Sequence, residues 1–228
     1  MHEVLVLCEG HTEREFCNRV IAPYLAHMGV GLKGTMVGNP QKKQGGVQGW
    51  PVYRKELIRL ARERTDRHVG VLVDYFRMPH SWPGRGTAPE RPITERGLHV
   101  ENALLEDLGQ ELDEYFHPCV QLHEFESLLF VDPERTAKTL SVTTPELSPE
   151  KLSQTLSSIK AQCEGNVEKI NNTPEKAPSK RISEVVPNYD KVAWGIFAVE
   201  EAGLDSLRTE CPWLDRWLER MESLGRPS

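Results

Sequence analysis

The stretch that decides the fold is Val4-Leu5-Val6-Leu7-Cys8-Glu9-Gly10-His11-Thr12-Glu13. It begins with an apolar run without alternation, which is typical of a strand buried on both faces of a parallel sheet. Glu9 and the residues after it read as a turn. Thr12 and Glu15 then have the spacing of a capping box, so we expect a helix that begins here and ends near Gly29. The chain therefore opens as strand, turn and helix.

The alternation of strand and helix continues along the chain. We expect further strands around residues 32–37, 69–73 and 119–122, and helices over 53–64 and 95–115. This order predicts an α/β fold with a mostly parallel four-stranded sheet flanked by helices. After Pro133 the sequence is rich in Thr, Ser and Pro and then becomes helical. We therefore expect an α/β core over residues 1–133 and a helical C-terminal region, packed on the core, over 134–228.

Length and composition restrict the class of protein. The 228 residues carry a net charge of −6, and a chain of this length can bury a core without disulfides. No run approaches the roughly 18 apolar residues of a membrane helix, and the acidic N-terminus is unlike a signal peptide. The five cysteines lack C-x-x-C spacing, which favours reduced thiols and a cytoplasmic location. The overall acidity argues against a protein that coats nucleic acid by bulk charge.

Carboxylates follow three of the expected strands. Glu9 follows the first, Asp74 follows the strand at 69–73, and Glu124 and Glu126 follow the strand at 119–122. In a parallel α/β sheet these carboxyl ends share one edge, where ligands bind. Oxygen ligands favour Mg²⁺ or Mn²⁺, which can polarise a phosphate and activate water. The alternative interpretation is that these acids cap helices.

Glu124 and Glu126 are two residues apart, so they would not share a face of a helix but would share a face of an extended segment. At most one of them is expected to reach the metal.

A small basic cluster is the candidate phosphate contact. Lys180 and Arg181, with Lys176 nearby, form a positive cluster in an acidic chain, which is compatible with a phosphate clamp or with an ordinary solvated surface. His11, in the turn after the first strand, is compatible with a phosphate contact or a solvated side chain. The sequence has no G-x-S-x-G, no G-x-x-x-x-G-K-[ST] and no H-x₃-H spacing, which disfavours a serine hydrolase, a P-loop protein and a zinc site.

Several of these blocks resemble known families. The run Cys8-Glu9-Gly10-His11-Thr12-Glu13 resembles the E-G-x-T-E opening of TOPRIM proteins, the metal-binding α/β domains of topoisomerases, primases and OLD-type nucleases. More narrowly, the chain resembles the bacterial domain-of-unknown-function family 4276 (DUF4276) in three blocks: Val73-Asp74-Tyr75-Phe76-Arg77-Met78-Pro79, Gln121-Leu122-His123-Glu124-Phe125-Glu126-Ser127-Leu128-Leu129-Phe130 and Ala177-Pro178-Ser179-Lys180-Arg181. The resemblance extends to Cys211-Pro212-Trp213.

This resemblance implies a TOPRIM-like fold and assigns roles to single residues. Glu9 would act near the scissile phosphate, as general acid/base or metal ligand, and Asp74 would hold Mg²⁺. The family's Asp-x-Asp is reduced here to Asp74-Tyr75-Phe76, and Glu124 or Glu126 could supply the second carboxylate. His11 and Thr12 would contact phosphate. Related proteins are often encoded beside ATPases in mobile-element defence systems, which implies an AAA- or ABC-type ATPase partner.

Three functions follow as hypotheses. The leading one is a nuclease that uses Mg²⁺ or Mn²⁺, with DNA rather than RNA as the expected substrate and an oligomer as a possible state. Glu9, Asp74 and Glu124 or Glu126 would hold the metal, and Lys180 or Arg181 would neutralise charge on the phosphate. The alternative is a non-catalytic adaptor or regulatory subunit of an ATPase, with a degenerate metal site. Phosphotransfer to a small substrate is disfavoured, because no glycine-rich loop is present to cradle a phosphate.

Overall fold

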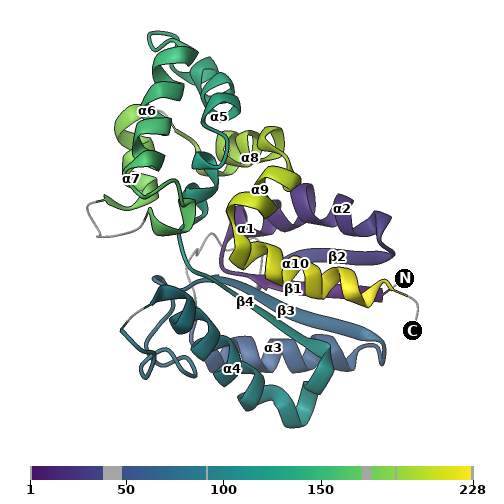
Figure 1. Ribbon diagram of the computed structural model, residues 1–228. Coiled ribbons are helices and arrows are strands. Elements are labelled where there is room, and N and C mark those ends of the chain that lie inside the picture. Colours follow the sequence, from purple (N-terminus) through teal and green to yellow (C-terminus); the bar gives the residue numbers. More distant parts are fainter. Residues whose placement is uncertain (1, 38–47, 91, 171–175, 188, 227–228) are drawn as a thin grey trace. The chain divides into compact units, whose positions relative to one another are not determined.

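The computed structural model describes residues 2–37, 48–90, 92–170, 176–187 and 189–226. The chain forms two compact units, one made of Met1–Leu122 with Arg216–Ser228 and the other of His123–Asp215. The first unit contains the sheet (Figure 1). Its elements are β1 (His2–Cys8), α1 (His11–Glu15), the π-helix η1 (Phe16–Ile21), α2 (Ala22–His27), β2 (Val30–Met36), α3 (Trp50–Arg62), β3 (Arg67–Asp74), α4 (Ile93–Leu112), the 3-10 helix η2 (Asp113–Tyr115) and β4 (Phe116–Gln121).

The sheet has four strands in the order β2-β1-β3-β4. Every pairing is parallel: Cys8 of β1 lies opposite Leu72 of β3, and Asp74 of β3 lies opposite Gln121 of β4. Figure 1 shows α3 and α4 along one face of this sheet and α1 and α2 along the other. The predicted α/β fold with a four-stranded parallel sheet is therefore confirmed, and the carboxyl ends of β1 and β3 are adjacent.

Burial explains why the strands read as continuous apolar runs. Val4, Val6 and Cys8 point to one face of β1 and Leu5 and Leu7 to the other, and all five are buried. The face that carries Leu5 and Leu7 belongs to the main apolar core, which also takes side chains from β3, β4, α3 and α4. Each strand of this kind is covered on both faces, so alternation is lost.

The expected capping box at Thr12 is wrong. The helix α1 begins one residue earlier, at His11, and Gly10 is its N-cap without a side-chain hydrogen bond. Thr12 is instead buried within the first turn. The helical run continues through η1 and α2 to His27, close to the expected end at Gly29. Only Glu9 and Gly10 separate the strand from the helix, so the connection is tight.

The π-helix η1 holds the edge strand β2. Asn18 of η1 donates from Nδ2 to the carbonyl of Gly34 over 3.2 Å and accepts the Gly34 N–H at Oδ1 over 2.8 Å. Both backbone groups of this edge residue are thereby paired, which protects an otherwise open sheet edge. A Cβ on Gly34 would lie 2.7 Å from Cys17 Cβ, so only glycine allows the helix to approach this closely.

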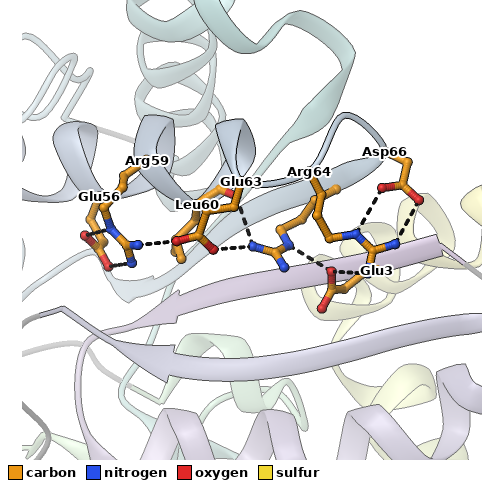
Figure 2. A network of polar contacts seen from close by, with 8 residues as sticks. Glu3, Glu56, Arg59, Leu60, Glu63, Arg64 and Asp66 are labelled. Carbon is orange, nitrogen blue, oxygen red and sulfur yellow. Dashed lines mark hydrogen bonds and ion pairs between the residues drawn. The ribbon is translucent and has the colours of Figure 1, made fainter.

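A network of ion pairs joins α3 to the amino ends of β1 and β3 (Figure 2). Glu63, which directly follows α3, pairs with Arg59 and with Arg67, and Arg67 pairs with Glu3 over 2.8 Å. Most of these side chains are partly exposed, so each pair contributes little to stability. The network lies at the end of the strands opposite to Glu9, and we regard it as structural.

The second unit is built from helices. Its described elements are η3 (Phe125–Phe130), α5 (Pro133–Leu140), η4 (Ser141–Thr143), α6 (Pro149–Ala161), η5 (Val167–Lys169), α7 (Pro178–Val185), the π-helix η7 (Lys191–Gly195), α8 (Ile196–Ala202) and α9 (Leu204–Glu210). Of these, η3, η4 and η5 are 3-10 helices. Ser148 caps α6 by accepting the Lys151 N–H. The helix α10 (Pro212–Leu224) begins in this unit and continues into the first.

The units divide the chain at Leu122 and again at Asp215, whereas the sequence predicted one division at residue 133. The chain returns to the first unit because the end of α10 packs there. Trp217 is buried and donates from Nε1 to the carbonyl of His117 over 3.4 Å, and Arg216 pairs with Glu101.

Membrane-spanning helices and the state of the cysteines are two further features that the sequence addressed. Among the described helices, none has the length and hydropathy needed to span a bilayer. All five cysteines are buried free thiols, as their spacing predicted.

Candidate active site at the carboxyl ends of the strands

Two of the predicted carboxylates lie side by side in the first unit. Glu9 directly follows β1, and Asp74 is the last residue of the neighbouring strand β3. The Glu9 N–H donates to the carbonyl of Leu72 over 3.2 Å, which continues the pairing of the strands. Glu9 Oε2 then accepts the backbone N–H of Asp74 over 3.2 Å. The sheet therefore fixes both residues at one edge, where parallel α/β proteins bind ligands.

Both carboxylates are withdrawn from water. Glu9 is 6% exposed and Asp74 is 7% exposed. Burial raises the pKa of Glu9 to about 7, and the negative charges of Glu13 and Asp74 add to this rise. The Asp74 N–H and Arg77, whose Nη1 lies 3.8 Å from Glu9 Oε1, act in the opposite direction on this pKa. A group of negative charges at a buried edge favours either a proton or a bound cation.

Asp74 also shapes the turn that follows β3. Its Oδ1 accepts the Phe76 N–H over 2.7 Å, and its carbonyl accepts the Met78 N–H over 3.1 Å. The intervening Tyr75 donates its N–H to the carbonyl of Gln121 in β4 over 2.9 Å. The Asp74 carboxylate is thereby held in one orientation. Phe76 occupies the position two residues after Asp74, where the sequence has no second aspartate.

His11 and Thr12 lie close to Glu9 in the chain. They are the first two residues of α1, which begins directly after Gly10, and the Arg14 N–H donates to the carbonyl of Gly10 over 3.1 Å. Thr12 is buried and His11 is half-buried. The proposed phosphate contact therefore suits the partly accessible His11 better than Thr12.

Glu124 and Glu126 lie in the second unit, where protein groups engage both. Glu124 Oε2 accepts the N–H of Ser179 in the first turn of α7 over 3.0 Å. Glu126 is 3% exposed, and its Oε2 forms an ion pair with Lys191 Nζ over 3.1 Å. Burial raises the pKa of Glu126 and Lys191 lowers it. Glu124 is the N-cap of the helix η3 and Glu126 lies inside it, so the two residues do not share one extended segment.

Lys180 and Arg181 lie in the first half of α7. Arg181 donates from Nε to the carbonyl of Lys176 over 3.0 Å and from Nη1 to Gln162 Oε1 over 3.2 Å. Its guanidinium therefore already has protein acceptors. Lys180 borders an open depression of about 340 Å³. The depression is lined by Ser179, Lys180, Ser183 and Glu184.

The structure adds residues that the sequence pattern did not assign to the site. Arg77 approaches Glu9, and Glu13 raises the pKa of Glu9 through its charge. Tyr53 of α3 donates its hydroxyl to the carbonyl of Cys8 over 3.5 Å. Glu13 and Arg77 stand within the quoted E-G-x-T-E and D-Y-F-R blocks, which is a signal that they belong to this site. Tyr53 gives no such signal, since its approach depends on how α3 packs.

In the first unit, Glu9 and Asp74 are two carboxylates that could act as ligands of a divalent metal. Across the described residues, no group of three or more His, Cys, Asp or Glu side chains is arranged to hold a metal ion. Mg²⁺ nevertheless keeps several waters and is often bound through one or two carboxylates together with substrate phosphates. Glu9 and Asp74 provide such a pair; burial raises the pKa of Glu9 and the negative charges of Glu13 and Asp74 raise it further, and a bound cation would act against this rise. The donor set therefore fits Mg²⁺ or Mn²⁺.

Comparison with known proteins gives one family and a small set of similar structures. The model of the domain of unknown function (DUF4276) matches residues 8–222. The C-terminal region of the Xanthomonas campestris pv. campestris OLD protein is similar at 16% identity with a TM-score of 0.45, covering 97% of this chain and 95% of that chain. The C-terminal region of the Burkholderia pseudomallei OLD protein is similar at 16% identity with a TM-score of 0.44, covering 98% of each chain. No curated protein matches the sequence.

Proposed function

This chain belongs to the family described as a domain of unknown function (DUF4276), and we propose that it is a divalent-metal-dependent nuclease of TOPRIM type. The observation that carries the proposal is the pair of buried carboxylates, Glu9 and Asp74, at the carboxyl ends of adjacent parallel strands. Burying Glu9 beside a second carboxylate is unfavourable, and a bound cation would offset that cost.

The proposed chemistry assigns a task to each residue. Glu9 and Asp74 hold Mg²⁺ or Mn²⁺, which when bound polarises a phosphate and lowers the pKa of water. The Phe76 N–H fixes the Asp74 carboxylate, so that this ligand is oriented before substrate arrives. Arg77, whose side chain reaches the edge of the site, offers a cation to a phosphate oxygen. His11, in the next turn, offers a further phosphate contact.

Cleavage of labelled DNA and RNA with Mg²⁺ or Mn²⁺ tests the proposal. We expect Glu9→Gln and Asp74→Asn to reduce the rate by at least about a hundredfold, as loss of a required charged group commonly does. Asp66→Asn is the matched control, because Asp66 is an exposed carboxylate just before the amino end of the same strand β3. Equal rates in the wild type, Glu9→Gln and Asp74→Asn would overturn the site assignment.

The same cleavage assay tests separately the candidate site residues of the second unit. Glu124→Gln, Glu126→Gln and Lys180→Ala test whether these side chains take part in cleavage. Lys191→Met tests whether an effect at Glu126 comes only from breaking their ion pair. A loss in Glu126→Gln that Lys191→Met reproduces would assign Glu126 to the fold of its unit.

One observation favours the adaptor alternative. In the described part of the chain, Asp74 has no second aspartate two residues later, and no metal group of three or more protein ligands forms. A non-catalytic subunit of an ATPase would tolerate both features. Calorimetric titration with Mg²⁺ and Mn²⁺ separates the hypotheses: heat that disappears in Asp74→Asn supports the nuclease, whereas no heat at millimolar metal supports the adaptor.

A further inference from the structure

An exposed aromatic ring stands beside the candidate carboxylates. Phe76 follows Asp74 by two residues and is 42% exposed. Single exposed apolar side chains are common on protein surfaces. What distinguishes Phe76 is the way in which its ring and backbone are held.

The ring rests on a rigid support. Phe76 meets the buried Tyr75 edge to face, with ring centroids 5.5 Å apart and planes at 87°. Arg85 lies over the Tyr75 ring, 4.1 Å from its centroid. Arg85 also donates to the Tyr75 carbonyl over 3.1 Å and to the Tyr75 hydroxyl over 3.2 Å. Tyr75 is thus held in place, and Phe76 packs against it while remaining 42% exposed.

The same turn joins the ring to the charged groups. The Phe76 N–H donates to Asp74 Oδ1 over 2.7 Å, and the next residue, Arg77, reaches to 3.8 Å from Glu9 Oε1. A carboxylate, an aromatic face and a cation therefore follow one another within a single turn. Proteins that bind single-stranded nucleic acid combine aromatic platforms for bases with cations for the backbone.

We infer that Phe76 stacks on an unpaired nucleobase next to the phosphate that a metal ion at Glu9 and Asp74, together with Arg77, would hold, so that the substrate is single-stranded or locally unpaired. The inference rests on the proposed nuclease function and specifies its substrate class. In a duplex the faces of the bases are covered by their neighbours, and the ring cannot reach them. Stacking needs only the π-face that every base has, so this contact selects strandedness and not sequence.

Binding of fluorescent oligonucleotides tests the inference without relying on cleavage. The Glu9→Gln background removes the expected cleavage and one negative charge, and anisotropy compares a single strand, its duplex and the same strand with abasic positions. We expect Phe76→Ala to weaken single-strand binding at least about tenfold, and to leave duplex and abasic binding unchanged. Phe76→Trp should retain binding, whereas Phe76→Leu should lose it, since leucine keeps apolar volume but has no π-face.

Phe197 provides the matched control. It is also 42% exposed and also contacts an aromatic ring, that of Trp194, with centroids 6.5 Å apart. Phe197→Ala should leave binding of the single strand unchanged. Thermal unfolding of the two alanine variants should shift by the same small amount, because the two residues are equally exposed, at 42%, and each contacts one aromatic ring.

The outcomes separate the two proposals. If the wild type cleaves nucleic acid but Phe76→Ala weakens binding of single strand, duplex and abasic strand equally, or not at all, the stacking inference is overturned and the nuclease proposal stands. The stacking inference is also overturned if Phe76→Ala disturbs only an association with another protein. If the wild type neither binds nor cleaves any nucleic acid, both proposals fall.

Discussion

At the scale of single residues, Glu9 is a buried carboxylate whose negative charge is unfavourable in the folded first unit. Burial raises its pKa to about 7, well above its ordinary value. Between pH 4.5, the ordinary pKa of a glutamate, and about pH 7, Glu9 is protonated in the folded state and ionised in the unfolded state. The free energy of unfolding therefore falls as the pH rises through this window. The loss is complete above about pH 7. The fold therefore tolerates a carboxylate that destabilises it at neutral pH, which is typical of functional sites.

Glu9→Gln should make the metal-free protein more stable at pH 8. Glutamine keeps an oxygen that can accept the Asp74 N–H but has no charge to bury, so we expect a gain of about 1–3 kcal/mol at pH 8 and little gain at pH 4.5. Urea unfolding in the presence of EDTA measures the difference. Asp66→Asn should show no such gain, because Asp66 is exposed. A Glu9→Gln protein that is less stable than the wild type at pH 8 would contradict the prediction.

Glu168 of the second unit is also a buried carboxylate with a raised pKa, although we assign it no part in the candidate site. Its replacement by glutamine should therefore also stabilise the protein at high pH. Burial raises its pKa to about 7, while the Trp213 N–H, which donates to its Oε1 over 3.1 Å, lowers it. Glu168→Gln keeps this acceptor, so we expect about 1 kcal/mol of stabilisation at pH 8 that disappears by pH 4.5. Nuclease activity should not change, which distinguishes Glu168 from Glu9. A Glu168→Gln protein with unchanged stability at pH 8 would show that this carboxylate is hydrated in solution.

The sequence predicted the part of the site that depends on the sheet alone. Glu9 and Asp74 meet because each ends a strand and the strands are parallel neighbours. The partners of Glu126 and Glu124 could not be predicted in this way. Lys191 and Ser179 lie more than 50 residues further along the chain, and only the packing of helices brings them together. Arg77 belongs to the sequence block that contains Asp74, but its approach to Glu9 depends on the turn after β3 and could not be predicted.

At the scale of elements, strands were easier to predict than helix ends. Apolar runs without alternation located β1 and β3 to within about two residues, because burial on both faces leaves a strong pattern. The helix after β1 begins at His11 rather than at a cap on Thr12. The error arises because Thr12 is buried against the unit, and tertiary packing overrides the local cap signal. The π-helix η1 has no sequence signature that we could use.

Asn18 offers a test of how η1 holds the sheet edge. Asn18→Ala removes both hydrogen bonds to Gly34, and we expect a loss of about 1–3 kcal/mol. Asn18→Asp is the matched variant, since it keeps the acceptor for the Gly34 N–H but replaces the donor with a carboxylate oxygen that repels the Gly34 carbonyl, so its loss should be at least as large. Amide exchange of β2 should accelerate in proportion to these losses. Equal stability of the wild type and Asn18→Ala would show that water replaces the side chain.

At the scale of the whole molecule, the first unit is discontinuous in sequence. It needs both Met1–Leu122 and Arg216–Ser228. The sequence could not predict that the chain ends in the first unit. The helix α10 reads as the last helix of the helical region, and its apolar stripe does not indicate which surface it packs against. The contacts of Arg216 and Trp217 with α4 and β4 supply that information.

The end of α10 should therefore control the stability of the sheet unit. Trp217 is 1% exposed, and we expect Trp217→Ala to cost about 3–5 kcal/mol. Arg216→Met should cost about 3 kcal/mol, since it removes the direct ion-pair partner of the buried Glu101, and adding Glu101→Gln should recover part of that loss. Glu219→Ala, on the exposed face of the same helix, is the control and should change stability by less than about 0.5 kcal/mol. Hydrogen exchange should accelerate at the amides of β1, β3 and β4 in Trp217→Ala. Acceleration confined to α5 and α6 would instead assign Trp217 to the second unit and overturn the discontinuous organisation of the first.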